Sequence, residues 1–78
     1  MSTPTIHEKV DVVFKDYPRI VLWRGREYKI TKLGFHHKYK KGSTLFHIFS
    51  VVSDTLFFRL KLDSTNLSWI LEGVNDAV

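Results

Sequence analysis

The sequence predicts an all-β fold: a curved antiparallel sheet of five or six strands that forms a small, partly open barrel of the SH3-like kind. Short β-type runs recur about every ten positions from Lys9 onward, and a turn signal closes each run. Aromatic residues make up 14% of the chain and favour half-buried pleated surfaces. No run shows a convincing helical period. Sequential hairpins predict a meander, and curling would shield its edges; the alternative is a flatter sheet that dimerises through an exposed face.

The length of 78 residues allows a single domain. We expect residues 1–8 to be a flexible leader and residues 9–78 to form the β domain. The chain has no cysteine, which excludes disulfides and cysteine nucleophiles and favours a cytoplasmic location. The N-terminal residues lack the apolar core of a signal peptide, and the longest apolar run, residues 20–23, is far too short to span a membrane.

The first elements are a candidate strand and a hairpin. Residues 10–15 alternate loosely and are a candidate first strand, which Pro18 would end. Residues 19–30 form a hairpin about Gly25. A two-residue turn at Arg24 and Gly25 would place Leu22 opposite Glu27 and Ile20 opposite Lys29. A three-residue loop that begins at Trp23 instead places Ile20 opposite Tyr28, and Leu22 opposite Arg26. We therefore expect the three-residue loop, with Trp23 off the main apolar face. The residues expected to share that face are Ile20, Leu22, Tyr28 and Ile30.

The remaining runs complete the sheet. Residues 31–35 continue as strand, with a bulge near Thr31 or a bend at Gly34 because the apolar phase slips there. Residues 36–43 are expected to be a polar, basic loop. Residues 44–52 are apolar on both parities, which indicates a central strand. Residues 55–62 alternate, and the inward-facing positions are Leu56, Phe58, Leu60 and Leu62. Residues 63–66 form a turn, and residues 67–74 form the last strand.

The positive charge is concentrated in the middle of the chain. The formal charge is +4 overall, and residues 24–41 hold seven basic residues and one acid, or +6. A cationic centre of this kind attracts anions. The alternative is that these basic residues form a solvated, lysine-rich surface whose only role is to protect sheet edges from aggregation.

Catalytic and metal sites are not expected. His36 and His37 are adjacent, so in a strand they point to opposite faces, although His47 could converge with one of them. No acid completes a ligand set in that region. No serine lies in a nucleophile elbow, and no glycine-rich loop could cradle a phosphate. We therefore expect no enzyme activity, no cofactor and no small-molecule substrate.

Two binding functions remain open. The leading hypothesis is a protein-interaction or assembly module, which includes self-association. It depends on apolar residues that face away from the expected core and would form an exposed patch if they cluster. These residues are Val21, Phe57 and Ile70.

The alternative is low-specificity binding of single-stranded nucleic acid through residues 23–41. Cations neutralise phosphates, and aromatic rings stack on bases. The residues that would do so are Trp23, Arg24, Arg26, Lys38, Tyr39, Lys40 and Lys41.

Two short patterns resemble a known group of proteins. The segment Trp23-Arg24-Gly25-Arg26-Glu27-Tyr28 is similar to a Trp-x-Gly-Arg-x-Tyr pattern, and Trp69-Ile70-Leu71 to a C-terminal Trp-x-Leu pattern, in small bacterial all-β domains of uncharacterised function. The resemblance covers residues 18–76 and implies a bacterial, cytoplasmic β domain. It implies no activity and no site residues. This chain departs from the group in its long His-Lys segment.

Overall fold

The structure, a computed structural model, describes residues 5–76, and this part of the chain contains seven β-strands and no helix. The strands are β1 (Thr5–Phe14), β2 (Pro18–Trp23), β3 (Arg26–Lys29), β4 (Lys32–Lys41), β5 (Thr44–Ser53), β6 (Leu56–Asp63) and β7 (Ser68–Asp76). The all-β prediction is confirmed, but the strand count is seven rather than five or six. Residues 5–8, expected in the leader, lie in β1, and residues 1–4 lie outside the described residues.

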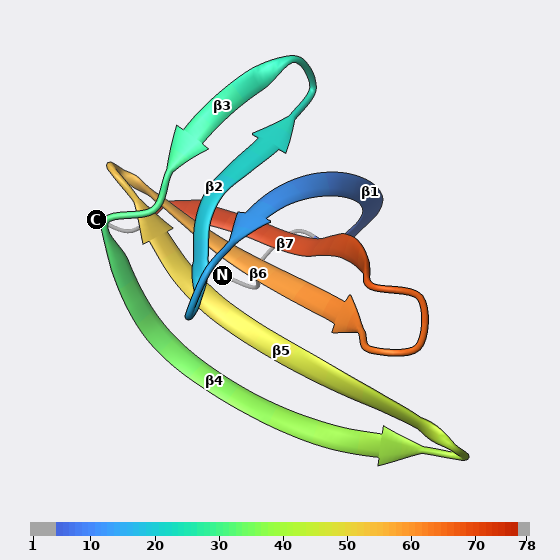
Figure 1. The fold of residues 1–78 in the computed structure, drawn as a ribbon. Coiled ribbons are helices and arrows are strands. Elements are labelled where there is room, and N and C mark those ends of the chain that lie inside the picture. Colours follow the sequence, from blue (N-terminus) through green and yellow to red (C-terminus); the bar gives the residue numbers. More distant parts are fainter. Residues whose placement is uncertain (1–4, 77–78) are drawn as a thin grey trace.

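The seven strands form one antiparallel sheet that curls into a half-barrel (Figure 1). The strand order is β3-β2-β1-β7-β6-β5-β4, so the expected simple meander is interrupted where β1 pairs with β7. Strands β3 and β4 follow one another in sequence but form opposite edges. At the connection between them, Ile30 N–H donates to the Arg19 carbonyl (2.8 Å) and Thr31 N–H donates to the Val52 carbonyl (2.8 Å). This corner therefore links the two edges.

Strand β1 serves two parts of the sheet. Its first half pairs with β7 up to Val10, which lies opposite Trp69. Its second half pairs with β2, where Val12 lies opposite Val21. The bend between the halves places the second half of β1, together with β2 and β3, across the concave side of the other strands (Figure 1). The core fills this concave inner face and includes Val10, Val21, Ile30, Phe49, Val51, Phe58, Leu60, Trp69 and Leu71.

The strand pattern that the sequence predicted for residues 55–62 is confirmed. Phe58 and Leu60 are fully buried, and Arg59 between them is exposed. The following turn also forms as expected, with side chains bonding to nearby backbone. Asp63 Oδ1 accepts from the Thr65 N–H (2.9 Å), and Asn66 Oδ1 accepts from the Ser68 N–H (3.1 Å). Alternation and turn chemistry agree here, and the local prediction holds.

The register predicted for the first hairpin is wrong. The turn is the two-residue one, and both central residues have positive φ, 52° at Arg24 and 75° at Gly25. This is a type I′ turn, whose twist matches that of the flanking strands. Trp23 therefore pairs with Arg26, and Val21 pairs with Tyr28. The buried set of β2 shifts by one residue: Val21 is fully buried, whereas Leu22 is exposed.

Residues 36–41, expected to be a loop, are strand. They pair with β5 down to a two-residue turn, where Gly42 has φ 63°. The predicted bend at Gly34 is confirmed as a register shift between Leu33 and Phe35. A Cβ at Gly34 would lie 3.2 Å from the Ser50 carbonyl oxygen, so the backbones approach too closely for a side chain. The ladder to β5, rather than burial, holds β4 in place.

Candidate binding surface along strand β4

Strand β4 is an edge strand with one free side. It pairs with β5 over its whole length, and among residues 5–76 no strand lies beyond it in the sheet order. Only His37 among its ten residues is even half-buried. Figure 1 shows the β4–β5 hairpin extending past the end of β6, and the pairing of β5 with β6 stops at Phe46. The far end of β4 therefore pairs with β5 but has no other strand beside it within residues 5–76.

The outer, convex face of β4 carries a row of rings. Phe35, His37 and Tyr39 alternate along the strand, with centroid separations of 5.2 Å and 6.4 Å. The row continues onto β5 through Phe46, whose ring is 5.4 Å from that of Tyr39. Phe35 is 57% exposed and Tyr39 is 38% exposed. Ile48, which lies opposite His37, is buried on this face.

The inner face of β4 carries histidine and lysine instead. His36 stacks on Phe49 with a centroid distance of 4.2 Å and an angle of 3°, and its Nε2 lies 3.0 Å from Nδ1 of His47. Stacking on Phe49 removes water from the His36 ring, and this partial desolvation holds the pKa of His36 below its ordinary value; electrostatic repulsion by the neighbouring basic groups, His47, His37 and Lys38, acts in the same direction. Lys38 lies opposite His47 and Lys40 opposite Leu45, so both lysines share this face.

The positive charge of β4 is not neutralised within the described part of the chain. Strand β4 holds four lysines and no acid, and none of the ion pairs within residues 5–76 includes one of them. By contrast, Lys61 on the neighbouring outer face lies 4.0 Å from Glu72 and 4.3 Å from the ring centroid of Phe46. We use the name β4 edge surface for six side chains of this strand. They are Phe35, His37 and Tyr39 on the outer face, and His36, Lys38 and Lys40 on the inner face.

The other predicted nucleic-acid residues lie elsewhere. Trp23, Arg24 and Arg26 flank the β2–β3 turn, which Figure 1 places at the opposite end of the molecule from the β4–β5 turn. Residues 23–41 therefore do not form one surface. Only the part that includes Lys38, Tyr39, Lys40 and Lys41 lies on β4.

The side chains at the β2–β3 turn already have partners in the fold. Glu8 accepts hydrogen bonds from Trp23 Nε1 (3.2 Å) and from the Arg24 guanidinium (2.7 Å). Arg24 holds the pKa of Glu8 below its usual range, and Trp23 acts in the same direction. Trp23 also packs edge-on against Phe58, with centroids 6.1 Å apart. Trp23 was expected off the main apolar face, and it instead packs against the core.

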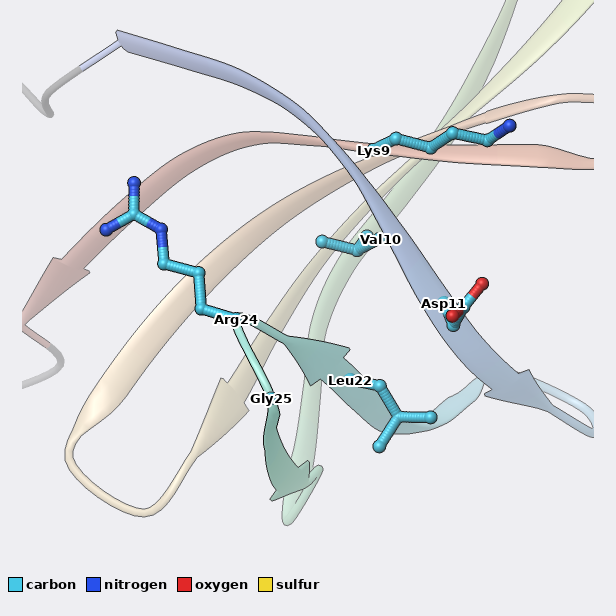
Figure 2. Close-up of a pocket in the computed structure, with 6 residues that line it drawn as sticks. All are labelled: Lys9, Val10, Asp11, Leu22, Arg24 and Gly25. Atoms are coloured by element: carbon cyan, nitrogen blue, oxygen red, sulfur yellow. The ribbon is translucent and has the colours of Figure 1, made fainter.

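The hollow between β1 and the β2–β3 turn contains no converging chemistry. It is lined by Lys9, Val10, Asp11, Leu22, Arg24 and Gly25. Figure 2 shows Lys9 and Arg24 pointing away from each other, and Arg24 is bound to Glu8. Asp11 is the one carboxylate in the lining, and neither Lys9 nor Arg24 is directed at it (Figure 2). This hollow supplies no acid–base pair.

The predicted protein-interaction residues separate in the structure. Val21 is fully buried in the core, so it cannot contribute to an exposed patch, because the hairpin register differs by one residue from the expected one. Phe57 and Ile70 do lie on the outer face and are half-buried. Ile70 is opposite Lys61, which is four positions along β6 from Phe57. The two residues are therefore not direct neighbours.

The sequence did not identify Phe35 and His37 as binding residues. Both belong to a period-2 pattern that ends at Tyr39, but the basic composition of residues 36–43 suggested a loop. The available signal was Gly42, which allows the positive φ of a tight two-residue turn and so extends a strand on either side.

Comparisons with protein-family models, with curated proteins and with solved structures find no match for this chain. Within residues 5–76, no group of three or more histidine, aspartate or glutamate side chains is arranged to hold a metal ion. The same residues include no helix with the length and apolar character needed to cross a bilayer.

Proposed function

We propose that this protein is a non-catalytic binding module that attaches to a protein partner through the β4 edge surface. The observation that carries the proposal is an exposed edge strand with outward-facing Phe35 and Tyr39 and four lysines that lack ion-pair partners within the described chain. Exposed aromatic rings are unfavourably solvated, and a protein partner that covers them would remove this unfavourable free energy. Unneutralised lysines favour an acidic partner.

The scaffold supports this role. A curled sheet with few exposed edges, of the kind the SH3-like barrels represent, offers rigid loops and a rigid edge strand for binding. Here β5, the strand that pairs with β4, is buried on both faces, by Phe49 on the inner face and Ile48 on the outer face. The lack of cysteine supports placing the module in the cytoplasm.

Single-stranded nucleic acid is the second candidate, and one observation favours it. The rings of Phe35, His37 and Tyr39 follow one another along one face, as do the aromatic side chains on which successive bases stack, and lysines flank them. Such binding would weaken steeply as salt is raised, since each neutralised phosphate releases counterions.

A display selection tests the first candidate. A library of random peptides is selected on the immobilised protein and counter-selected on a Phe35→Ala, Tyr39→Ala double variant. Leu22→Ala is the matched control. The exposed fraction of Leu22, 40%, is similar to the 38% of Tyr39, but Leu22 lies on β2. Acidic peptides that bind the wild type and the control but not the double variant are the expected result.

Two outcomes contradict the proposal. One is selected peptides that bind the double variant as well as the wild type. The other is a labelled oligo-dT that binds with a steep salt dependence while no selected peptide competes with it, which would favour the nucleic-acid candidate. Circular dichroism of each variant confirms that the sheet is intact.

A further inference from the structure

The two faces of β4 differ in chemistry. Side chains on the outer face are the rings of Phe35, His37 and Tyr39, and those on the inner face are His36, Lys38 and Lys40. A strand that lay alongside β4 would place alternate side chains on these two faces, because side chains alternate in any β-strand. Its apolar side chains would contact the rings, and its acidic side chains would meet the lysines.

The backbone of β4 is also free to pair. Strand β4 is the last strand in the sheet order, and hydrogen-bonded and non-hydrogen-bonded pairs alternate along its ladder to β5. Every second residue therefore turns its N–H and C=O groups toward the open side. From Phe35 to Lys41 the ladder is regular, since the only register shift lies at Gly34. A row of unpaired backbone groups of this kind is a template for another strand.

We propose that β4 binds an extended segment of a partner protein as an additional strand of the sheet, and that this segment alternates apolar and acidic residues. The proposal rests on the proposed function and specifies the partner's chemistry. Backbone hydrogen bonds supply affinity in this mode of recognition, and side chains supply specificity. The apolar residues lie beside Phe35 and Tyr39, and the acidic residues lie beside Lys38 and Lys40.

A second copy of this chain fits the edge poorly. Strand β4 contains no acid, so a β4–β4 pair would bring lysines and histidines together with no opposite charge to offset them. The other edge strand, β3, is only four residues long and includes Arg26 and Lys29 beside its single acid, Glu27. Charge complementarity therefore points to a different, acidic segment.

The test compares three synthetic peptides as long as β4. The first alternates glutamate with valine, the second has the same composition in two blocks, and the third repeats the first with N-methyl groups on alternate amides. Each is titrated into the full-length protein while the amide resonances are followed by NMR. We expect the alternating peptide to bind roughly tenfold or more tightly than either of the others, and to shift and protect amides of β4.

Protein variants test the charged face. Changing Lys38→Glu and Lys40→Glu together should abolish binding of the alternating peptide, and Lys38→Gln with Lys40→Gln should weaken it. Lys9→Glu is the matched control, because Lys9 is exposed on β1, which lies four strands from β4 in the sheet order β1-β7-β6-β5-β4. It should bind like the wild type.

The outcomes separate this inference from the proposed function. If all three peptides bind β4 equally, strand addition is wrong, although the surface still binds protein. If the shifts map to residues outside β4 and β5, both are wrong. If no peptide binds and oligo-dT shifts the amides of β4, the surface is a nucleic-acid platform and both proposals fall.

Discussion

Replacing Phe58 with alanine should remove a large part of the stability of this domain. Phe58 has no exposed surface, and its ring packs edge-on against Tyr28 at 5.2 Å and Trp23 at 6.1 Å. A buried phenylalanine removes about 150–250 Å² from water, and at about 25 cal/mol per Å² this area corresponds to roughly 4–6 kcal/mol. Alanine keeps a part of this contribution, so the expected loss is about 3–5 kcal/mol. A chain of this length is stable by roughly 4–12 kcal/mol.

The neighbouring ring supplies the comparison. Phe57 lies on the outer face and is half-buried, and it pairs with Val52 and Asn75 rather than with core residues. We expect Phe57→Ala to cost about 1 kcal/mol, as is usual for partly exposed positions. The two substitutions remove the same atoms from adjacent positions, so the difference between them measures the two faces of β6.

Urea denaturation followed by circular dichroism and by the fluorescence of Trp23 and Trp69 measures both losses. With a slope of about 1–3 kcal/mol per M, the Phe58→Ala midpoint should fall by more than 1 M, and that of Phe57→Ala by much less. If Phe58→Ala does not fold, Phe58→Leu should still lose about 1–2 kcal/mol. Equal losses at the two positions would refute the assignment of the faces.

Three further outcomes are expected. The Arg24 guanidinium holds the pKa of Glu8 below its ordinary 4.5, so this ion pair stabilises the fold at neutral pH and is lost as pH falls through the lowered value; Arg24→Ala should raise the Glu8 pKa in an NMR titration, and an unchanged pKa would rule out this cause. Burial lowers the pKa of His36 from 6.5, so the unfolded chain takes up the proton first and stability decreases as pH falls below about 6.5. His36→Gln should flatten this part of a Tm–pH curve, and an equally steep curve would contradict the assignment. Gly34→Ala places a Cβ 3.2 Å from the Ser50 carbonyl oxygen and should cost about 1 kcal/mol in urea denaturation, whereas a neutral result would mean that the bulge adjusts freely.

Much of the fold follows from alternation and turn chemistry. Residues 55–62 alternate because one face of β6 is in the core, and Phe58 and Leu60 are buried as predicted. The turn at residues 63–66 follows from side chains that bond their own backbone. The phase slip near Gly34 indicated a bend, and the structure has a register shift there.

The hairpin of β2 and β3 shows why register is harder to predict. The choice between two turns depended on pairing apolar with apolar residues, and that reasoning placed Leu22 inside and Trp23 outside. The observed type I′ turn puts Arg24 in a left-handed conformation that nonglycine residues adopt rarely. Its twist and the burial of Val21 outweigh this cost. The shift of one residue reversed the faces of β2, whereas Tyr28 still packs against the core and Ile30 is buried, as predicted.

The candidate site was only partly predictable for a related reason. An edge strand is held by backbone hydrogen bonds to one neighbour, so its side chains carry little burial signal. Residues 36–41 are almost all exposed and looked like a basic loop. Tyr39 and its lysines were identified, but the row formed with Phe35 and His37 depends on the strand geometry. The separation of Trp23 from Lys38 depends on topology that no local pattern encodes.

The pairing of β1 with β7 has a consequence for how this protein reaches its native state. The hairpins β2–β3 and β4–β5 close short loops and can form early, but the first half of β1 has its partner only in the final strand. Joining these distant segments carries the loop-closure entropy of nearly the entire chain. We therefore expect folding on the slow, millisecond-to-second scale of nonlocal β topologies, with the native sheet forming only after β7 is available.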